Sequence, residues 1–297
     1  MSLSLISPAK INLFLYVRDK RDDGMHELYS LMALIDLCDQ IKIEFKGSGI
    51  KVGCDHPKVP ADPTNLAWQA ADLFVDHHIQ KLGAPPFQGI DIQIDKKIPV
   101  GGGLGGGSSN AAAILTGLNK MAGQPFLKAE LEKMALTLGA DVPFFILGEP
   151  AFASGVGEQL IPCGNLPRFW VVVCSPGVSA NTGDVFKKLE FGLTFTSNYI
   201  MNTGSNTLVF EPELDGREEL HNDLEGPACK LYPEISSTKE EMALLLQRNV
   251  YMSGSGSSLF ALYSDHAEAN HGFRRIAKAW EGKNRQVFLS RIGEYGL

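Results

Sequence analysis

Six of the seven residues from Gly101 to Gly107 are glycine, and this run carries the strongest chemical signal in the sequence. Glycine weakens regular structure, so a cluster of it is favoured where bare backbone must approach another group closely. The helical pattern that follows is expected to start near Ser108 and Ser109, whose hydroxyls suit capping. Free N–H groups and the positive end of the helix dipole would then face the loop, which predicts a phosphate cradle. A flexible linker is the alternative, but linkers seldom run from a strand directly into a helix.

The glycine run does not match the two best-known nucleotide loops. No lysine follows the glycines, as the pattern GxxxxGK[ST] requires. Residues 101–106 fit GxGxxG formally, but almost any spacing fits within a run of glycine. The acidic residue expected about 20 positions further on, at the end of a strand, is missing, and a second helical pattern occupies that stretch. The sequence therefore argues against a dinucleotide-binding fold.

Lys10, Asn12 and Asp141 are polar residues placed where they could act on a bound group. Lys10 and Asn12 lie two positions apart in the alternating segment "AKINLFLYV", so they share one face of a predicted strand. Asp141 begins the segment "DVPFF", where an aspartate followed by Pro143 fits a helix N-cap. A carboxylate can also accept a proton from a hydroxyl. From the residues alone, the cap for Asp141 and a solvated strand position for Lys10 are the simpler interpretations.

Periodicity predicts the elements that must position these residues in the first half of the chain. A helix is expected between a cap at Asn65 and a stop at Gly83, and another helix follows the glycine run. Leu131 and Leu138 belong to a third helix, and Gly139 lies just past its end. Alternation of apolar residues predicts strands, at 9–17, 39–47 and 89–95.

The second half mixes strands and helices without regular alternation. Strands are expected at 168–177, 258–263 and 285–292, and helices at about 233–247 and 266–281. The polar stretch 192–216 has little pattern. This order favours an α+β fold over a doubly wound sheet. We expect two domains, at residues 1–158 and 159–297, with the boundary between residues 155 and 165.

Composition restricts the possible partners and compartment. The chain has 297 residues and a formal net charge of -7, without the basic run that a nucleic-acid binder would need. No apolar segment approaches the ~18 residues of a membrane span, and no export signal is visible. Five cysteines without a CxxC pair fit reduced thiols. We expect a cytoplasmic protein, a monomer or weak homodimer, with no nucleic-acid or membrane partner.

Four segments in order resemble the motifs of GHMP kinases. They are "SPAKINLFL", "PVGGGLGGGSSNAA", "LGADVPFF" and "YMSGSGSSLFALY", and the resemblance extends from residue 7 to residue 263. Within the family, "RDDGMHEL", "LGADVPFF" and "SPGVSANT" are similar to the members that act on a cytidine-diphosphate-linked methylerythritol. Homoserine, mevalonate and galactose kinases match these segments less well.

The resemblance implies an architecture and a reaction. It implies an N-terminal, ribosomal-protein-like ATP-binding domain with a left-handed βαβ crossover, and a ferredoxin-like C-terminal domain, with the site between them. The implied reaction transfers the γ-phosphoryl group of ATP to the 2-hydroxyl of the cytidine-diphosphate-linked methylerythritol, in the non-mevalonate route to isopentenyl diphosphate. Magnesium is implied because it neutralises charge between the β- and γ-phosphates. The sequence does not name its ligands, and Ser108 is one candidate.

The resemblance also implies roles for individual residues. Asp141 matches the catalytic base, and Lys10 matches the cation beside it, which would keep the aspartate ionised and offset developing charge. The glycine run and its neighbours would bind ATP, with Asn65 and Lys96 as weaker candidates. This set is Pro99, Val100, Gly101, Gly102, Gly103, Leu104, Gly105, Gly106, Gly107, Ser108, Ser109, Asn65 and Lys96.

A second set of residues would bind the acceptor. Asn12 would hydrogen-bond it, His26 would read the cytosine edge and Phe186 would stack on the base, although composition alone would put Phe186 in the core. The segment "SGSGSS", read alone, is a hairpin turn; as the third family motif it would close over the phosphates and acceptor. The acceptor set is Asn12, Met25, His26, Gly177, Thr182, Phe186, Ser253, Gly254, Ser255 and Gly256.

Met25 departs from the family pattern, which commonly has tyrosine at this position. A thioether can still lie against a ring, so the departure bears on base stacking and not on the chemistry. Two rival functions remain open from the sequence. One is another GHMP kinase, of the homoserine or mevalonate class, and the other is a non-catalytic nucleotide- or RNA-binding relative. The acidic balance disfavours RNA, and the presence of both Lys10 and Asp141 disfavours a non-catalytic sensor.

Overall fold

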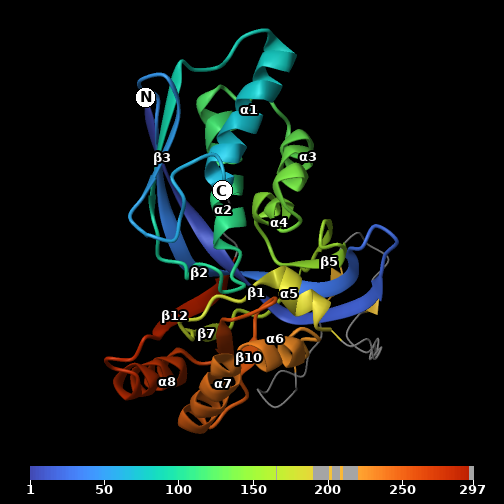
Figure 1. Cartoon of the computed structure of the whole chain (residues 1–297), viewed down its shortest axis with the longest axis vertical. Coiled ribbons are helices and arrows are strands. Elements are labelled where there is room, and N and C mark those ends of the chain that lie inside the picture. The colour runs from blue at the N-terminus through green and yellow to red at the C-terminus, as the bar shows by residue number, and fades with distance from the viewer. Residues whose placement is uncertain (165, 190–200, 203–207, 210–219, 294–297) are drawn as a thin grey trace.

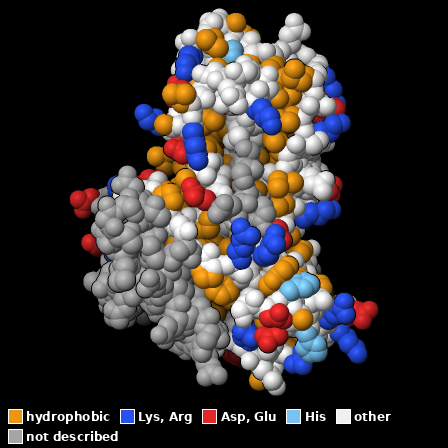
Figure 2. All heavy atoms as spheres, turned by 180° about the vertical axis from the view of Figure 1, so that it is seen from behind, with side chains coloured by type: hydrophobic (Ala, Val, Ile, Leu, Met, Phe, Trp, Pro, Cys, Tyr) orange, Lys and Arg blue, Asp and Glu red, His pale blue; other side chains and the backbone are white. Residues whose placement is uncertain are grey.

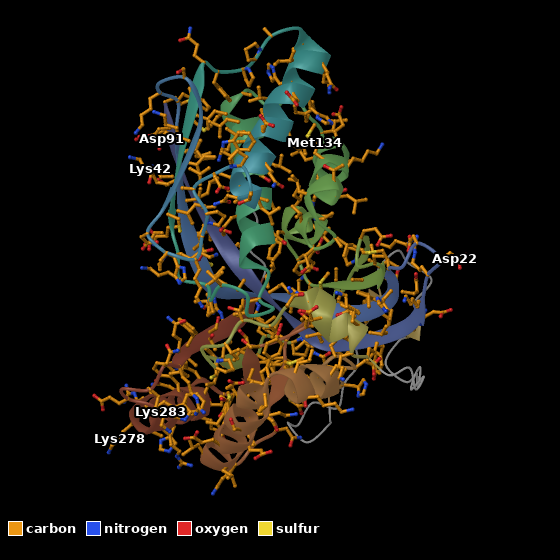
Figure 3. The ribbon with its side chains drawn as sticks, viewed as in Figure 1. Asp22, Lys42, Asp91, Met134, Lys278 and Lys283 are labelled. Atoms are coloured by element: carbon orange, nitrogen blue, oxygen red, sulfur yellow. The ribbon has the colours of Figure 1, made fainter. Side chains whose placement is uncertain are left out.

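A long antiparallel hairpin of β1 (Ser2–Lys20) and β2 (His26–Glu44) forms the backbone of the fold. Figure 1 presents the computed structural model, which describes residues 1–164, 166–189, 201–202, 208–209 and 220–293. The hairpin bends across the molecule, and Figure 3 shows Asp22 at its tip. Both strands extend well beyond the predicted segments 9–17 and 39–47. Alternation marks a strand with one solvated face, whereas residues 29–35 of β2 are all buried and give no such signal.

In the described part of the chain, ten strands join into one mixed sheet with a continuous path of seven strands. Its order is β10–β11–β7–β12–β2–β4–β3, while β1 and β5 pair with β2, and β6 pairs with β5. β3 and β4 are parallel and are connected by α1 (Leu66–Leu82), so they form a βαβ unit. The remaining bounds are β3 Gly49–Cys54, β4 Gly89–Asp95, β5 Ala151–Gly155, β6 Gln159–Pro162, β7 Trp170–Ser175, β10 Tyr251–Met252, β11 Leu259–Tyr263 and β12 Gln286–Gly293. A separate small ladder joins β8 (Met201–Asn202) to β9 (Leu208–Val209).

Four helices pack on one side of the sheet to form the upper lobe of Figure 1. They are α1, α2 (Gly106–Met121), α3 (Lys128–Leu138) and α4 (Val142–Leu147). α2 contacts β1, β2 and each of the other three helices, so it is the centre of this lobe. Fully buried Phe74, Leu115 and Phe144 pack there against Ile92 of β4. This core holds the start of α2, and with it the glycine loop, in a fixed position.

The lower lobe of Figure 1 is built from β7, β10, β11 and β12 with three helices. These helices are α6 (Glu225–Leu231), α7 (Pro233–Leu246) and α8 (His266–Ala279), and α8 contacts β7, β11 and β12. Fully buried Val172, Ile235 and Ile276 belong to its core. The short helix α5 (Thr182–Lys187) lies between the two lobes (Figure 1). Lys278 and Lys283 lie at the outer end of the lower lobe (Figure 3).

Several local predictions are confirmed, and one is wrong. Asn65 caps α1 through its side chain, Gly83 ends it in the left-handed conformation, and Gly139 follows the last residue of α3. The hairpin prediction for "SGSGSS" is confirmed because this segment joins antiparallel β10 and β11. The expected start of α2 near Ser108 is wrong: the helix begins at Gly106, after Gly105.

The α+β class is confirmed by the mixed sheet and its helical layers. The sheet continues across residues 158 and 159, because β12 pairs with both β2 and β7. The division into domains 1–158 and 159–297 therefore stays a prediction. Most of the weakly patterned stretch 192–216 lies outside the described residues. Among the described residues, no helix combines the length and apolar character needed to span a membrane.

Candidate active site

A cavity of about 1070 Å³ collects residues from both halves of the chain. The hairpin β1–β2, the glycine run and the start of α4 line it from the N-terminal half, and α5 and the turn between β10 and β11 line it from the C-terminal half. Most residues of the predicted site therefore meet around one space. A cavity of this volume lies at the upper end of the range for small-molecule sites, so it has room for two ligands side by side.

The cavity concentrates positive charge in an acidic chain. Its charged lining, apart from the ionisable His26, consists of five lysines and one carboxylate: Lys10, Lys20, Lys58, Lys96, Lys187 and Asp141. The whole chain carries a net charge of -7. On the face in Figure 2, by contrast, basic and acidic side chains are interspersed. Such local concentration of one sign attracts polyanionic ligands, and Asp141 is the one carboxylate that the described lining offers as a base.

Hydrogen bonds from other segments to its carbonyl groups hold the glycine loop in place. Gly101, Gly103 and Gly105 all have positive φ values, of 71°, 73° and 70°. Four successive carbonyl oxygens, from Gly101 to Leu104, accept hydrogen bonds from other segments. Their donors, in order, are the N–H of Ala180, the N–H of Ser258, the hydroxyl of Ser253 and the N–H of Lys10. With the carbonyls directed outward, the loop can present N–H groups to an anion, as a backbone nest does.

The start of α2 adds further donors to this loop. α2 begins at Gly106, and no side chain caps its first turn, so its N-terminal N–H groups suit a phosphate. Ser108 lines the cavity. Ser109 does not, and the capping role expected for it is wrong: its fully buried hydroxyl accepts a hydrogen bond from Ser7 at 2.7 Å. Glycine is required here because a β-carbon on Gly103 would lie 2.4 Å from the carbonyl oxygen of Ser253.

Lys10, Asn12 and Asp141 meet at the bottom of the cavity. The Lys10 Nζ atom lies 3.4 Å from an Asp141 carboxylate oxygen and donates to Asn12 Oδ1 at 2.6 Å. Asp141 occupies the N-cap position of α4, but its side chain makes no capping bond. The Asp141 carboxylate therefore does not cap α4 in this structure. The Asp141 side chain is 38% exposed, whereas that of Lys10 is 6% exposed, so the carboxylate remains accessible from the cavity.

Lys96 is paired with a carboxylate that sequence reasoning missed. Its ammonium forms an ion pair with Asp39, which is fully buried, and lies 3.3 Å from Asn110 Oδ1. Asp39 also accepts the backbone N–H groups of Lys97 and Ile98, both at 2.8 Å. The pairing fixes the segment that leads into the glycine loop. The sequence around Lys96 does not indicate which of the 34 acidic residues pairs with it, so Asp39 could not be identified from the sequence.

Asn65 lines the cavity, but its polar atoms serve the local fold. Its Oδ1 accepts the N–H of Ala67 at 2.9 Å and its Nδ2 donates to the carbonyl of Pro60 at 2.7 Å. The predicted helix cap is confirmed. Pro99 and Val100 also line the cavity, directly before the glycine run.

An aromatic pair defines another part of the cavity. His26 and Phe186 are stacked with ring centroids 4.7 Å apart and an interplanar angle of 24°. Burial lowers the pKa of His26, and the charge of Lys20 lowers it further, so the neutral imidazole is favoured. Met25 also lines the cavity and is 50% exposed. Aromatic rings and a neutral imidazole, which can both donate and accept, suit a flat heterocyclic base.

The remaining acceptor residues divide into two groups. Thr182, Ser255 and Gly254 line the cavity, and the Thr182 and Ser255 hydroxyls lie 2.7 Å apart. The others lie outside the lining. Ser253 is fully buried and donates to Gly103 while it accepts the N–H of Asn12 at 3.3 Å. The other two members of this outer group, Gly177 and Gly256, adopt positive φ values, of 82° and 84°.

Comparison with known proteins identifies the class to which this fold and cavity belong. Residues 65–149 match the model of the GHMP kinase N-terminal domain, and residues 214–282 match that of the GHMP kinase C-terminal domain. The chain therefore belongs to the GHMP kinase family.

Several relatives of similar length share one name. A "4-diphosphocytidyl-2-C-methyl-D-erythritol kinase" of Citrifermentans bemidjiense is 40% identical over 278 residues, which cover 93% of this chain and 95% of the relative. A protein of the same name from Trichormus variabilis is 34% identical over 313 residues, covering 100% and 98%. A crystal structure titled 4-(cytidine 5'-diphospho)-2C-methyl-D-erythritol kinase matches with a TM-score of 0.78 and 37% identity, covering 98% and 99% of the two chains.

Proposed function

We propose that this chain is a 4-diphosphocytidyl-2-C-methyl-D-erythritol kinase. It uses ATP to phosphorylate the 2-hydroxyl of 4-(cytidine 5'-diphospho)-2-C-methyl-D-erythritol, in the formation of isopentenyl diphosphate by the non-mevalonate route. The observation that carries the proposal is the cavity itself. One space contains a glycine loop at a helix start, a carboxylate beside a lysine, and a stacked aromatic pair with a neutral histidine. The named relatives at 34–40% identity support the same acceptor.

The two ligands divide the cavity between them. ATP places its phosphates on the glycine loop and the start of α2, where outward-facing carbonyls leave N–H groups to the anion. The cytosine of the acceptor lies against Phe186 and Met25, and His26 reads its edge. Both ligands are polyanions, so the lysines of the lining favour both of them.

The reaction takes place at Asp141. Its carboxylate accepts the proton of the 2-hydroxyl as the oxygen attacks the γ-phosphorus, and the bond from that phosphorus to the β,γ-bridging oxygen of ATP breaks. Lys10, 3.4 Å from the carboxylate, offsets the negative charge that spreads over the transferring group. Asn12 holds the Lys10 ammonium in place by accepting a hydrogen bond from it.

Magnesium fits this site as a partner of the nucleotide. Magnesium usually takes its ligands from phosphates and water together with one or two protein carboxylates. The lining offers one carboxylate, Asp141, and the Ser108 hydroxyl at the helix start. In the described part of the chain, no cluster of three or more metal-binding side chains forms a separate site. When bound, the ion would neutralise charge between the β- and γ-phosphates.

ADP release in the presence of Mg-ATP tests the proposal. The purified chain is supplied separately with the cytidine-diphosphate-linked methylerythritol, homoserine, mevalonate and galactose. We expect turnover with the first acceptor at a kcat/KM at least about 10⁴-fold above the others, because a site that binds a base and a diphosphate loses both contacts with small alcohols. Preference for any other acceptor would refute the proposal.

Two further expectations accompany this function. We expect a monomer or weak homodimer in the cytoplasm, without a nucleic-acid partner. The domain division at residues 158 and 159 is part of the same proposal, with ATP bound by residues 1–158. Sedimentation of the purified chain measures its oligomeric state directly.

A further inference from the structure

Three buried side chains form a hydrogen-bonded chain that ends at Lys10. The Ser30 hydroxyl donates to the carbonyl oxygen of Phe14 at 2.6 Å, and Asn12 Nδ2 donates to Ser30 Oγ at 2.8 Å. Asn12 Oδ1 then accepts from Lys10 Nζ at 2.6 Å. Ser30, Asn12 and Lys10 are only 3–4% exposed, so these bonds are largely shielded from water. Ser30 belongs to none of the motifs found in the sequence.

We infer that Ser30 is a positioning residue that sets the orientation of the Asn12 amide and thereby the place of the Lys10 ammonium. This inference rests on the proposed function of Lys10 and Asp141.

The direction of the chain is fixed at its inner end. A backbone carbonyl can only accept, so the Ser30 hydroxyl must donate its one hydrogen to the carbonyl oxygen of Phe14. The serine oxygen is then left with lone pairs only, and it requires a donor from its other neighbour. Asn12 must therefore direct its NH₂ group to Ser30, which directs its carbonyl oxygen to Lys10. The reverse amide orientation would place the amide oxygen against the serine lone pairs and the NH₂ group against an ammonium.

A local irregularity of the hairpin makes this geometry possible. The register of β1 against β2 shifts between Asn12 and Phe14, and after the shift Leu15 pairs with Ser30. Bulges of this kind redirect side chains beside functional sites. Because of the shift, Ser30 reaches both the Phe14 carbonyl and the Asn12 amide from the neighbouring strand.

The consequence concerns the hydrogens of Lys10. Its ammonium has three N–H donors, and one of them makes a short hydrogen bond to Asn12 Oδ1. The other two remain for Asp141, 3.4 Å away, and for a phosphate oxygen. If the Asn12 amide loses its anchor, the Lys10 ammonium loses a fixed position, and misplacement of a group that acts on the transition state lowers kcat.

A double-mutant cycle tests the inference. We compare kcat, both KM values and thermal unfolding for Ser30→Ala, Asn12→Ala and the combined variant. Ser290→Ala is the matched control, because Ser290 is also buried in a strand, and its hydroxyl donates to Asp36 at 2.6 Å, outside the cavity lining. Ser30→Thr keeps a hydroxyl and serves as the rescue variant.

We expect Ser30→Ala to lower kcat about tenfold, with both KM values within about twofold. In the Asn12→Ala background the same change has no further effect, because Ser30 acts through Asn12. Ser30→Thr retains at least about a third of the wild-type kcat. Independent, multiplicative effects of Ser30→Ala and Asn12→Ala overturn the inference, as does an equal loss of kcat in the Ser290→Ala control.

A readout without turnover separates this inference from the proposed function. The rate at which a small acylating reagent modifies the Lys10 amine is followed by mass spectrometry on the intact chain. We expect a several-fold change in this rate in both Ser30→Ala and Asn12→Ala, and none in Ser290→Ala. An unchanged rate in Ser30→Ala refutes the positioning role. Lack of turnover by the wild-type chain refutes the proposed function and leaves this test in force.

Discussion

Substitution of Gly103 by alanine probes the glycine loop at the position where the geometry is least tolerant. The new β-carbon would lie 2.4 Å from the carbonyl oxygen of Ser253 and 2.8 Å from that of Gly256, and both are backbone atoms that cannot rotate away. Gly103 also has a φ of 73°. For alanine this left-handed conformation costs about 1–2 kcal/mol. Relief of the contact to an ordinary separation requires the loop to move by roughly 1 Å.

Such a movement acts directly on ATP. Displacement of a positioned group by about 1 Å can cost as much as 10²-fold in rate, so we expect ATP binding to weaken by at least about tenfold. Gly107→Ala is the matched control, because its β-carbon would meet only Leu66 Cδ1, at an ordinary 3.5 Å. Gly107 lies inside α2, where alanine is favoured over glycine by about 0.5–1 kcal/mol.

Nucleotide titration by calorimetry, together with thermal unfolding, measures both variants. We expect Gly103→Ala to raise the ATP Kd by at least about tenfold and Gly107→Ala to change it by less than about threefold. The acceptor KM should change little in either. Normal ATP affinity in a folded Gly103→Ala variant would show that the loop does not bind the phosphates.

Four substitutions and a change of pH test other parts of the site. Asp141→Asn should lower kcat by about 10²-fold or more while the chain still folds, because the carboxylate makes no capping bond; near-normal turnover rules out the base. Asp39→Asn leaves a buried ammonium poorly paired, so urea unfolding should show a loss of about 3–5 kcal/mol; an unchanged midpoint contradicts the ion pair. Phe186→Ala should raise the acceptor KM, and Met25→Tyr should lower this KM by at most about tenfold. Neither substitution should change kcat much, and the stacking role fails if Phe186→Ala leaves the acceptor KM unchanged. Burial lowers the pKa of His26 from 6.5, so its neutral form persists below that pH. The unfolded chain then binds the proton more readily, so acidification below about 6.5 destabilises the fold through this group, and the acceptor KM should rise only there; a KM that rises already between pH 8 and 7 is the contrary result.

Local patterns in the sequence were sufficient for many of the elements. Asn65 and Gly83 bound α1 as predicted, because a cap requires only the residue and its own first or last turn. The shared face of Lys10 and Asn12 follows from the two-residue period of a strand. The glycine run before α2 was visible because no other residue type gives the required backbone. These features depend on neighbours within a few positions of the chain.

The long hairpin and the two pairings of the site needed the tertiary structure. β2 is buried on both faces over residues 29–35, so the alternation that would reveal its length is absent there. His26 and Phe186 are 160 positions apart, and only the packing of α5 beside the hairpin stacks their rings. Asp39 and Lys96 likewise meet through the pairing of β2 with β4.

The start of α2 and the role of Asp141 show why local rules reach a limit. Capping rules favoured Ser108 and Ser109, but the helix starts at Gly106, and the hydroxyl of Ser109 is engaged by Ser7 from β1. The same rules made Asp141 a cap, and its position in α4 agrees, yet its carboxylate lies beside Lys10. A side chain at a helix terminus can bond its own helix or a charge from another strand. The sequence determined which residues stood at these termini, and the folded chain decided which partner each of them met.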